Sequence, residues 1–232
     1  MCIIIVILLL FTNQVKIRAM NTYTKMYAIT TVNIRSKPTT DSKSVGMKYW
    51  NEPIYIIERV KQKWYKIHYK GKERYVTSKY VRKKRIKYRR YNSPSNNSFK
   101  SCLPSSCITN STKLAQGRLK SKYRLDYKTG VYMVGDRYCV ALGSYYTKYK
   151  IGIKVDLVLS HKGRKHILKC IVADQKADKD TINGHKIHTD GSVAEFVVNS
   201  SVMPHHARYI HGDVSYAGKQ FQGKIAEIRV YK

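Results

Sequence analysis

The sequence predicts an all-β protein built from two small barrels joined by a linker. Tyrosine is the signature aromatic residue, with 20 copies against 4 phenylalanines, and it fits the pleated, half-buried surface of a strand. Apolar and polar residues alternate in runs such as EPIYIIERV and KWYKIHYK, which is typical of short strands. We expect no long helix, because Pro204 interrupts SVMPHHARYI and leaves room for one turn.

Composition divides the chain into three blocks. Residues 26–84 alternate apolar and polar positions between frequent turn residues, which favours a small β-barrel. Residues 85–118 begin with a basic run and continue rich in Ser, Asn and Pro, so we expect a linker there. Strands resume over 119–232, where we expect a six-stranded barrel from the segments GVYMVG, RYCVALG, IKVDLVLS, HILKCIVAD, SVAEFVVNS and KIAEIRVYK.

An apolar run, CIIIVILLLF, occupies residues 2–11. It is shorter than the roughly 20 residues that span a bilayer, and it suits the hydrophobic region of a secretory signal. No Lys or Arg precedes the run, and Met20 could equally be the start of the protein. We therefore interpret residues 1–19 as a candidate signal peptide, and we expect export with no stable membrane span in the mature chain.

The formal net charge of +31 predicts a salt-sensitive attraction to a polyanion. Nucleic acid, an anionic membrane and an anionic wall polymer all qualify, and a lysine-rich proteome without any dedicated partner is the simpler alternative. The run VRKKRIKYRR, residues 81–90, carries seven basic residues. It could bind a phosphate-rich polymer, or it could be the solvated start of the linker. Nucleic acid is less favoured, because the aromatic motif of an RNA-recognition sheet and zinc-finger spacing are both missing.

Five cysteines are present, and Cys2 lies in the apolar run. The remaining four are an even number, compatible with disulfides in an oxidising compartment. Cys102 and Cys107 flank LPSS, where a loop could close on itself, whereas Cys139 and Cys170 lie in strand-like segments and could be buried thiols.

The first barrel resembles a known family. VNIRSKPTTDSKSVG is followed by EPIYIIE and by KWYKIHYKGKERYVTSKYV, a succession similar to the bacterial SH3 domain over residues 27–82. Lys37 stands where the family has Gly, and Tyr75 stands where it has Trp. The positions that align are Val32, Asn33, Ile34, Arg35, Ser36, Pro38, Trp64, Tyr65, Ile67, Gly71, Val76, Ser78, Tyr80 and Val81. The resemblance implies an SH3-like barrel that attaches an extracellular protein to peptidoglycan in the cell wall.

Four residues of this barrel are the candidate binding residues: Arg35, Trp64, Tyr65 and Tyr75. Trp64 and Tyr65 are neighbours on a strand and point to opposite faces, so one can enter the core while the other faces a groove. Arg35, Tyr65 and Tyr75 could equally serve only to stabilise the barrel.

The second barrel resembles a diverged double-psi β-barrel, as in expansins, rare-lipoprotein-A-like proteins and the three-aspartate domains of wall-remodelling enzymes. The resemblance covers about residues 123–231. Asp174 falls at an aspartate of the family pattern, Gln175 replaces the glycine after it, and Glu195 replaces the last aspartate. The other matches, in order, are Thr129, Gly130, Val140, Ala141, Gly152, Lys154 and Val155.

Asp174 and Glu195 are the candidate catalytic residues that this resemblance implies. Cleaving a glycosidic bond needs an acid that protonates the leaving oxygen, and a second carboxylate can support the charge that develops on the sugar. In a lytic transglycosylase the sugar's own hydroxyl attacks, so one acid can suffice. Asp174 ends the apolar strand CIVA, where burial would raise its pKa, whereas Glu195 within VAEFVV could simply face solvent.

No metal or cofactor is expected. DQKADKD lacks the glycine and distal glutamate of an EF-hand loop, and the histidines lack zinc-protease spacing. The expected function is that of an exported, wall-associated protein that binds peptidoglycan and cleaves or remodels its glycan, in a cell or in phage-mediated lysis. The alternatives are a non-catalytic wall-binding or adhesive module and a basic nucleic-acid-binding protein.

Overall fold

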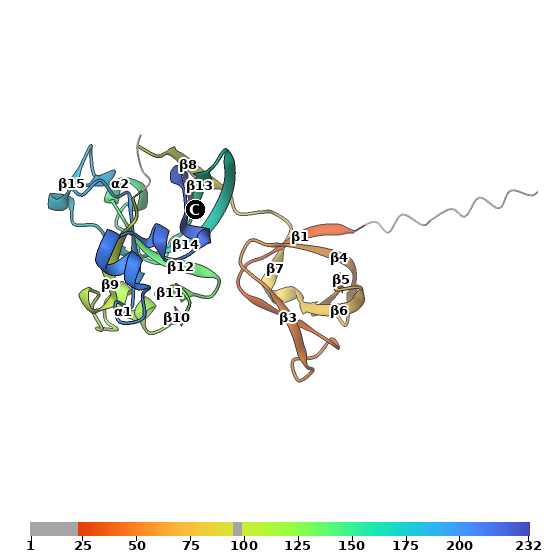
Figure 1. Cartoon of the computed structure of the whole chain (residues 1–232). Coiled ribbons are helices and arrows are strands. Elements are labelled where there is room, and N and C mark those ends of the chain that lie inside the picture. Colours follow the sequence, from red (N-terminus) through yellow and green to blue (C-terminus); the bar gives the residue numbers. More distant parts are fainter. Residues whose placement is uncertain (1–22, 95–98) are drawn as a thin grey trace, which may run out of the picture.

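The computed structural model describes residues 23–94 and 99–232, and it confirms the all-β class. Figure 1 shows two bodies of strands joined by an extended segment. The described residues hold two large sheets and a third sheet of two short strands. The expected signal peptide, residues 1–19, lies outside the described residues. In the part of the chain that is described, no helix has the length and apolar character needed to cross a membrane.

The first body is a seven-stranded antiparallel sheet with the order β3-β2-β6-β5-β4-β1-β7. Alternation in the sequence places Ile34, Ile54, Ile67 and Val76 inside it, each at most 2% exposed, and their burial stabilises the barrel. Its elements are β1 (Thr24–Ala28), β2 (Val32–Arg35), β3 (Ser44–Lys48), β4 (Pro53–Val60), β5 (Trp64–Tyr69), β6 (Lys72–Thr77), η1 (Ser78–Tyr80) and β7 (Val81–Arg82).

The segment expected as a linker, residues 85–118, contributes two strands to the second body. β8 (Tyr88–Asn92) pairs with the last strand of the chain, and β9 (Ser101–Pro104) runs parallel to β17 (Ala194–Val198). β8 lies at the edge of the larger sheet, where charged side chains discourage pairing with further strands. The basic run of the sequence therefore ends in an edge strand.

The second body is a nine-stranded sheet that contains all six predicted strands, which are β11, β12, β13, β14, β17 and β18. Its long path is β10-β11-β17-β12-β14-β13-β18-β8, and β9 joins it on β17. The elements are η2 (Ser105–Cys107), α1 (Ala115–Lys120), β10 (Arg124–Asp126), β11 (Val131–Val134), β12 (Arg137–Leu142), α2 (Ser144–Thr147), β13 (Lys154–His161), β14 (Arg164–Gln175), η3 (Asp178–Asp180), β15 (Thr181–Ile182), β16 (Ile187–His188), a π-helix (His206–His211), η5 (Val214–Tyr216), η6 (Lys219–Phe221) and β18 (Lys224–Tyr231). A barrel-like second body is thus confirmed, whereas its double-psi closure stays a prediction.

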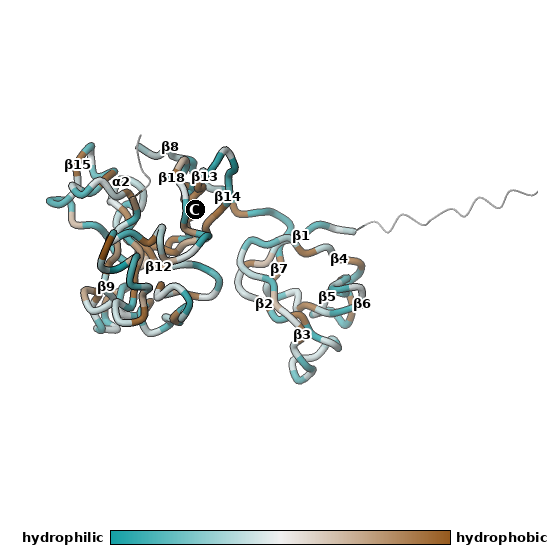
Figure 2. Tube along the Cα trace, in the orientation of Figure 1, coloured by the Kyte–Doolittle hydropathy of each residue, from teal (hydrophilic) through white to brown (hydrophobic). Residues whose placement is uncertain are grey.

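Strand β12 separates two apolar clusters on the opposite faces of this sheet. Val140 and Leu142 pack into the larger cluster with Phe196, while Cys139 packs with Ile171 into the smaller one. Figure 2 shows hydrophobic segments gathered around β12, inside the second body. Burial of both faces explains why these strands read as nearly continuous apolar runs.

The four cysteines of the described residues are free thiols. Cys139 and Cys170 are buried, as the sequence indicates. Cys102 and Cys107 do not form the expected loop-closing disulfide. Cys102 instead packs against the larger apolar cluster, and its thiol lies 3.6 Å from the sulfur of Met203.

The two bodies meet at Trp50, in the turn between β3 and β4. Its ring lies edge-on to Tyr231 at 4.8 Å between centroids, with the Arg137 guanidinium 5.1 Å from its centroid. Beside it, Lys169 Nζ lies 2.9 Å from a carboxylate oxygen of Glu52. Trp50 is 9% exposed, so the joint buries a large aromatic side chain.

Candidate functional site

A hollow of about 310 Å³ opens on the first barrel, between β2, β5, β6 and η1. Two of the predicted binding residues, Arg35 and Trp64, line it. Its other lining residues are Thr31, Val32, Asn33, Thr40, Thr77, Lys79 and Tyr80. The hollow therefore combines apolar surface with hydroxyl groups and two cations.

Arg35 owes its position to the end of β2 and to the turn that follows. Its Nη1 donates to the carbonyl oxygen of Ser42 at 2.5 Å, which ties the guanidinium to that turn. Lys79 lies on the other wall, with its Nζ 5.4 Å from the centroid of the Tyr80 ring. Guanidinium and ammonium groups bind carboxylates, and aromatic rings pack against apolar ligand faces. The hollow therefore suits a ligand that offers a carboxylate and an apolar face.

Tyr65 and Tyr75 do not line this hollow. Tyr65 packs against the core of the barrel, and the Arg59 guanidinium lies 6.0 Å from its ring centroid. Tyr75 is the register partner of Arg35 across β2 and β6. Sequence reasoning missed Lys79, although it stands within the SKY segment that closes the family pattern.

In the second body, Asp174 and Glu195 lie on the two strands that flank β12. Ala141 is the register partner of Asp174 on β14 and also of Glu195 on β17. Register partners in a sheet share a face, so both carboxylates project to the same side. Two strand spacings put their Cα atoms about 9–10 Å apart. The structure brings these two predicted site residues together.

Burial raises the pKa of Asp174 above its ordinary value, and the negative charge of Glu195 acts in the same direction. The amide of Gln175 donates to Oδ1 at 2.9 Å, and the side chain of Gln116 on α1 donates as well, which limits the rise. Asp174 is only partly buried. A reachable carboxyl with a raised pKa is suited to donate a proton.

Glu195 has a different environment, because Lys176 Nζ lies 3.1 Å from its Oε1. The Lys176 side chain has no solvent exposure, and that of Glu195 is 15% exposed. Lys176 also donates to Oγ of Ser192 at 2.9 Å and to its carbonyl oxygen at 3.2 Å. The expectation that Glu195 could face solvent is wrong. Sequence reasoning missed Lys176, since its burial depends on the loop that carries Ser192.

His188, Asp190 and Glu195 are the candidate metal ligands of the described residues, with ligand atoms within 4.8 Å of one another. His188 Nδ1 lies 3.0 Å from an oxygen of Asp190. A metal ion here would lie close to the buried ammonium of Lys176, which repels cations. The cluster is better described as an ion-pair network. Asp178, the first residue of η3, accepts hydrogen bonds from Ser144 and Tyr149.

Comparison with known proteins agrees with the geometry of the first barrel. Residues 30–82 match the family model described as "Bacterial SH3 domain", and these residues run from the turn before β2 through β7. A search of curated proteins gave no match. The structure of NlpC2 from Trichomonas vaginalis is similar at 13% identity and a TM-score of 0.25, over 78% of this chain and 69% of that one. That likeness is too distant to bear on fold or activity. Residues 30–82 of this chain form a bacterial SH3 domain.

Proposed function

We propose that this is an exported, cell-wall-associated protein that binds peptidoglycan through the hollow of its bacterial SH3 domain. The observation that carries the proposal is the hollow itself, where Arg35, Lys79 and Trp64 surround one space in a domain of this class. Peptidoglycan offers matching chemistry, because its stem peptides carry carboxylates and its sugars have apolar faces.

The second body cleaves or remodels the glycan, with Asp174 as the general acid. Asp174 gives its proton to the glycosidic oxygen as the bond to that oxygen breaks. A hydroxyl of the same sugar then attacks the carbon left behind and returns a proton to the carboxylate, as in lytic transglycosylases. The raised pKa of Asp174 and its place beside Ala141 support this role.

Glu195 supports the positive charge that develops on the sugar. Its ion pair with Lys176 holds the carboxylate in place on β17. A non-catalytic wall-binding module would use the SH3 hollow alone. In that case Asp174 and Glu195 would only stabilise the fold.

The experiment is a pull-down of the purified protein with peptidoglycan sacculi at low and high salt, with mass spectrometry of released fragments. Salt-resistant pelleting with release of anhydro-muropeptides supports both parts of the proposal. Pelleting without release from wild type overturns the catalytic part. Pelleting no greater than that of an unrelated basic protein at high salt overturns wall binding and favours the nucleic-acid alternative.

Asp174→Asn separates chemistry from binding. We expect this variant to pellet like wild type and to lose release of anhydro-muropeptides by about 100-fold or more, the scale of a lost general acid. Release that is unchanged in Asp174→Asn would remove Asp174 from the mechanism.

A further inference from the structure

A basic surface surrounds the tip of the hairpin formed by β13 and β14. Two hollows adjoin there, of about 490 Å³ and 660 Å³, and both are lined by His161, Lys162 and Gln222. We call the two together the hairpin groove. Its basic lining residues are His161, Lys162, Arg164, Lys165, His166, Lys219 and Lys224.

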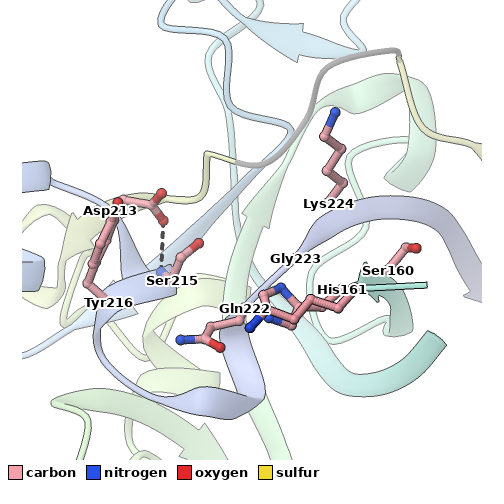
Figure 3. Close-up of a pocket in the computed structure, with 9 residues that line it drawn as sticks. Ser160, His161, Asp213, Ser215, Tyr216, Gln222, Gly223 and Lys224 are labelled. Carbon is pink, nitrogen blue, oxygen red and sulfur yellow. Dashed lines mark hydrogen bonds between the residues drawn. The ribbon is translucent and has the colours of Figure 1, made fainter. Parts of the chain in front are cut away.

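Three separate parts of the chain build this groove. Figure 3 shows Ser160 and His161 on one wall, Gln222 from the turn after η6, Lys224 from the first position of β18, and Asp213 and Tyr216 on the opposite side. Folding therefore assembles a charge cluster that the linear sequence disperses over more than sixty positions, from 160 to 224.

The basic side chains of the groove have no carboxylate partner among the described residues. Across the described residues, none of the groove's basic side chains lies within 4.0 Å of a carboxylate oxygen. Asp213 is the one acidic residue among the lining residues, and it is 9% exposed. It already accepts from the amide of Ser215 at 2.8 Å and from the amide of Lys100 at 3.3 Å.

Uncompensated cations along a hollow attract a chain of anions more strongly than one isolated anion, because each contact releases a counterion. The lining residues also include the hydroxyl of Ser160 and the amide of Gln222, which can bond neutral hydroxyl groups between the anions. A polymer of alternating phosphates and polyol units offers both kinds of group.

Nucleic acid fits this groove less well. Proteins that hold single strands stack the bases on several aromatic side chains, whereas Tyr216 is the only tyrosine, tryptophan or phenylalanine among the residues lining the groove. One face of its ring is covered by His211, with 3.7 Å between ring centroids and an interplanar angle of 12°.

We propose that the hairpin groove is a second binding site, for a phosphodiester-linked polyol polymer of the cell wall. The choice of a wall polymer rests on the proposed location of the protein. The site uses neither the SH3 hollow nor the pair Asp174 and Glu195, so it extends the function to a second component of the wall.

The test measures binding of the purified protein to poly(glycerol phosphate) over a range of salt concentrations. The site variant combines Lys162→Gln, Arg164→Gln and Lys165→Gln, three exposed residues of the hairpin tip. We expect about a tenfold or greater loss of affinity near physiological salt, and a salt dependence whose log–log slope is smaller by about two.

The control variant makes the same change of net charge elsewhere on the second body. It combines Lys113→Gln, Lys128→Gln and Lys150→Gln, three exposed residues outside the groove. We expect it to bind nearly as wild type does. Equal losses in the two variants would show that net charge alone drives binding, and would overturn the site.

A single-stranded oligonucleotide with the same number of phosphates provides the second arm. Tighter binding to the oligonucleotide than to poly(glycerol phosphate), lost in the site variant, would overturn the polymer class. Sacculi stripped of phosphate polymers separate this proposal from the SH3 proposal, because the site variant should pellet with them like wild type. Circular dichroism and thermal unfolding verify that both variants fold.

Discussion

Lys176 Nζ lies 3.1 Å from Glu195 Oε1, in a side chain that has no contact with solvent. This contact gives the two candidate carboxylates different environments, although both flank Ala141. Glu195 has a buried cation beside it, whereas Asp174 has amide donors and apolar surroundings. Pairs of acids whose environments differ in this way can divide the roles of acid and charge stabiliser.

Removing the cation tests the contact. We expect Lys176→Met to lower the free energy of unfolding by about 3 kcal/mol, because Glu195 is left partly buried without its partner. The double variant Lys176→Met with Glu195→Gln should recover at least half of that loss. Urea unfolding at neutral pH measures both. A loss in Lys176→Met below about 0.5 kcal/mol, the range of ordinary surface changes, would show that the pair has little influence on the fold.

Asp174 should make stability depend on pH in an identifiable direction. Its pKa in the folded protein lies above the ordinary 3.8, so the folded state holds the proton more tightly than the unfolded state. The stabilisation by protonated Asp174 is complete below pH 3.8 and is lost as pH rises through the folded-state pKa. We therefore expect Asp174→Asn to be more stable than wild type at pH 7.

The measurement is urea unfolding of wild type and Asp174→Asn at pH 7 and near pH 3.5. The advantage of the variant should shrink at the lower pH, where wild-type Asp174 is also neutral. An advantage of equal size at both pH values would mean that the Asn side chain stabilises by packing, and the inferred titration would be wrong.

The SH3 hollow predicts which cations matter for wall binding. Lys79→Gln should weaken pelleting with sacculi by about tenfold or more, the scale of one lost charge-assisted contact. Arg35→Gln should do the same, although it also frees the turn at Ser42. Lys37→Gln is the matched control, since Lys37 is exposed and does not line the hollow. Equal pelleting of Lys79→Gln and Lys37→Gln would place the ligand elsewhere.

Trp50 should couple the two bodies. Trp50→Ala removes its contacts with Tyr231 and Arg137, and we expect a loss of about 3 kcal/mol, as for other buried aromatic side chains. Differential scanning calorimetry should show one transition for wild type and two for the variant. Tyr55→Ala, at an exposed tyrosine of the same barrel, should keep one transition. A single unchanged transition in Trp50→Ala would show that the joint contributes little.

Much of the fold could be predicted from the sequence because its signals are local. All six predicted strands of the second body exist, since alternation and apolar runs report directly on which faces are buried. The SH3 pattern likewise depends on short segments in a fixed order, and it correctly placed Arg35 and Trp64 in one barrel.

The rest depends on pairing between distant segments. β8 reads as a polar, basic stretch, and it becomes a strand because its backbone pairs with β18 more than 130 positions later. The hairpin groove and the burial of Lys176 also arise only when separate loops meet. Local patterns carry no information about contacts between distant segments, which are set by the sheet topology.

The residue before β18 offers a last test, because Gly223 lies where that strand begins to pair with β13. Its φ is +105°, and a Cβ there would lie 2.5 Å from the carbonyl oxygen of Ser160. Gly223→Ala should therefore lower the free energy of unfolding by about 3 kcal/mol, since it adds a steric clash to an unfavourable backbone conformation.

Gly184→Ala is the matched control, because Gly184 has φ +67° and open space where a Cβ would stand. It should cost about 1 kcal/mol, from the backbone conformation alone. The difference between the two variants in urea unfolding then reports the contact with Ser160. Equal costs would mean that β18 can move away from β13, and the hairpin groove would then have an adaptable wall.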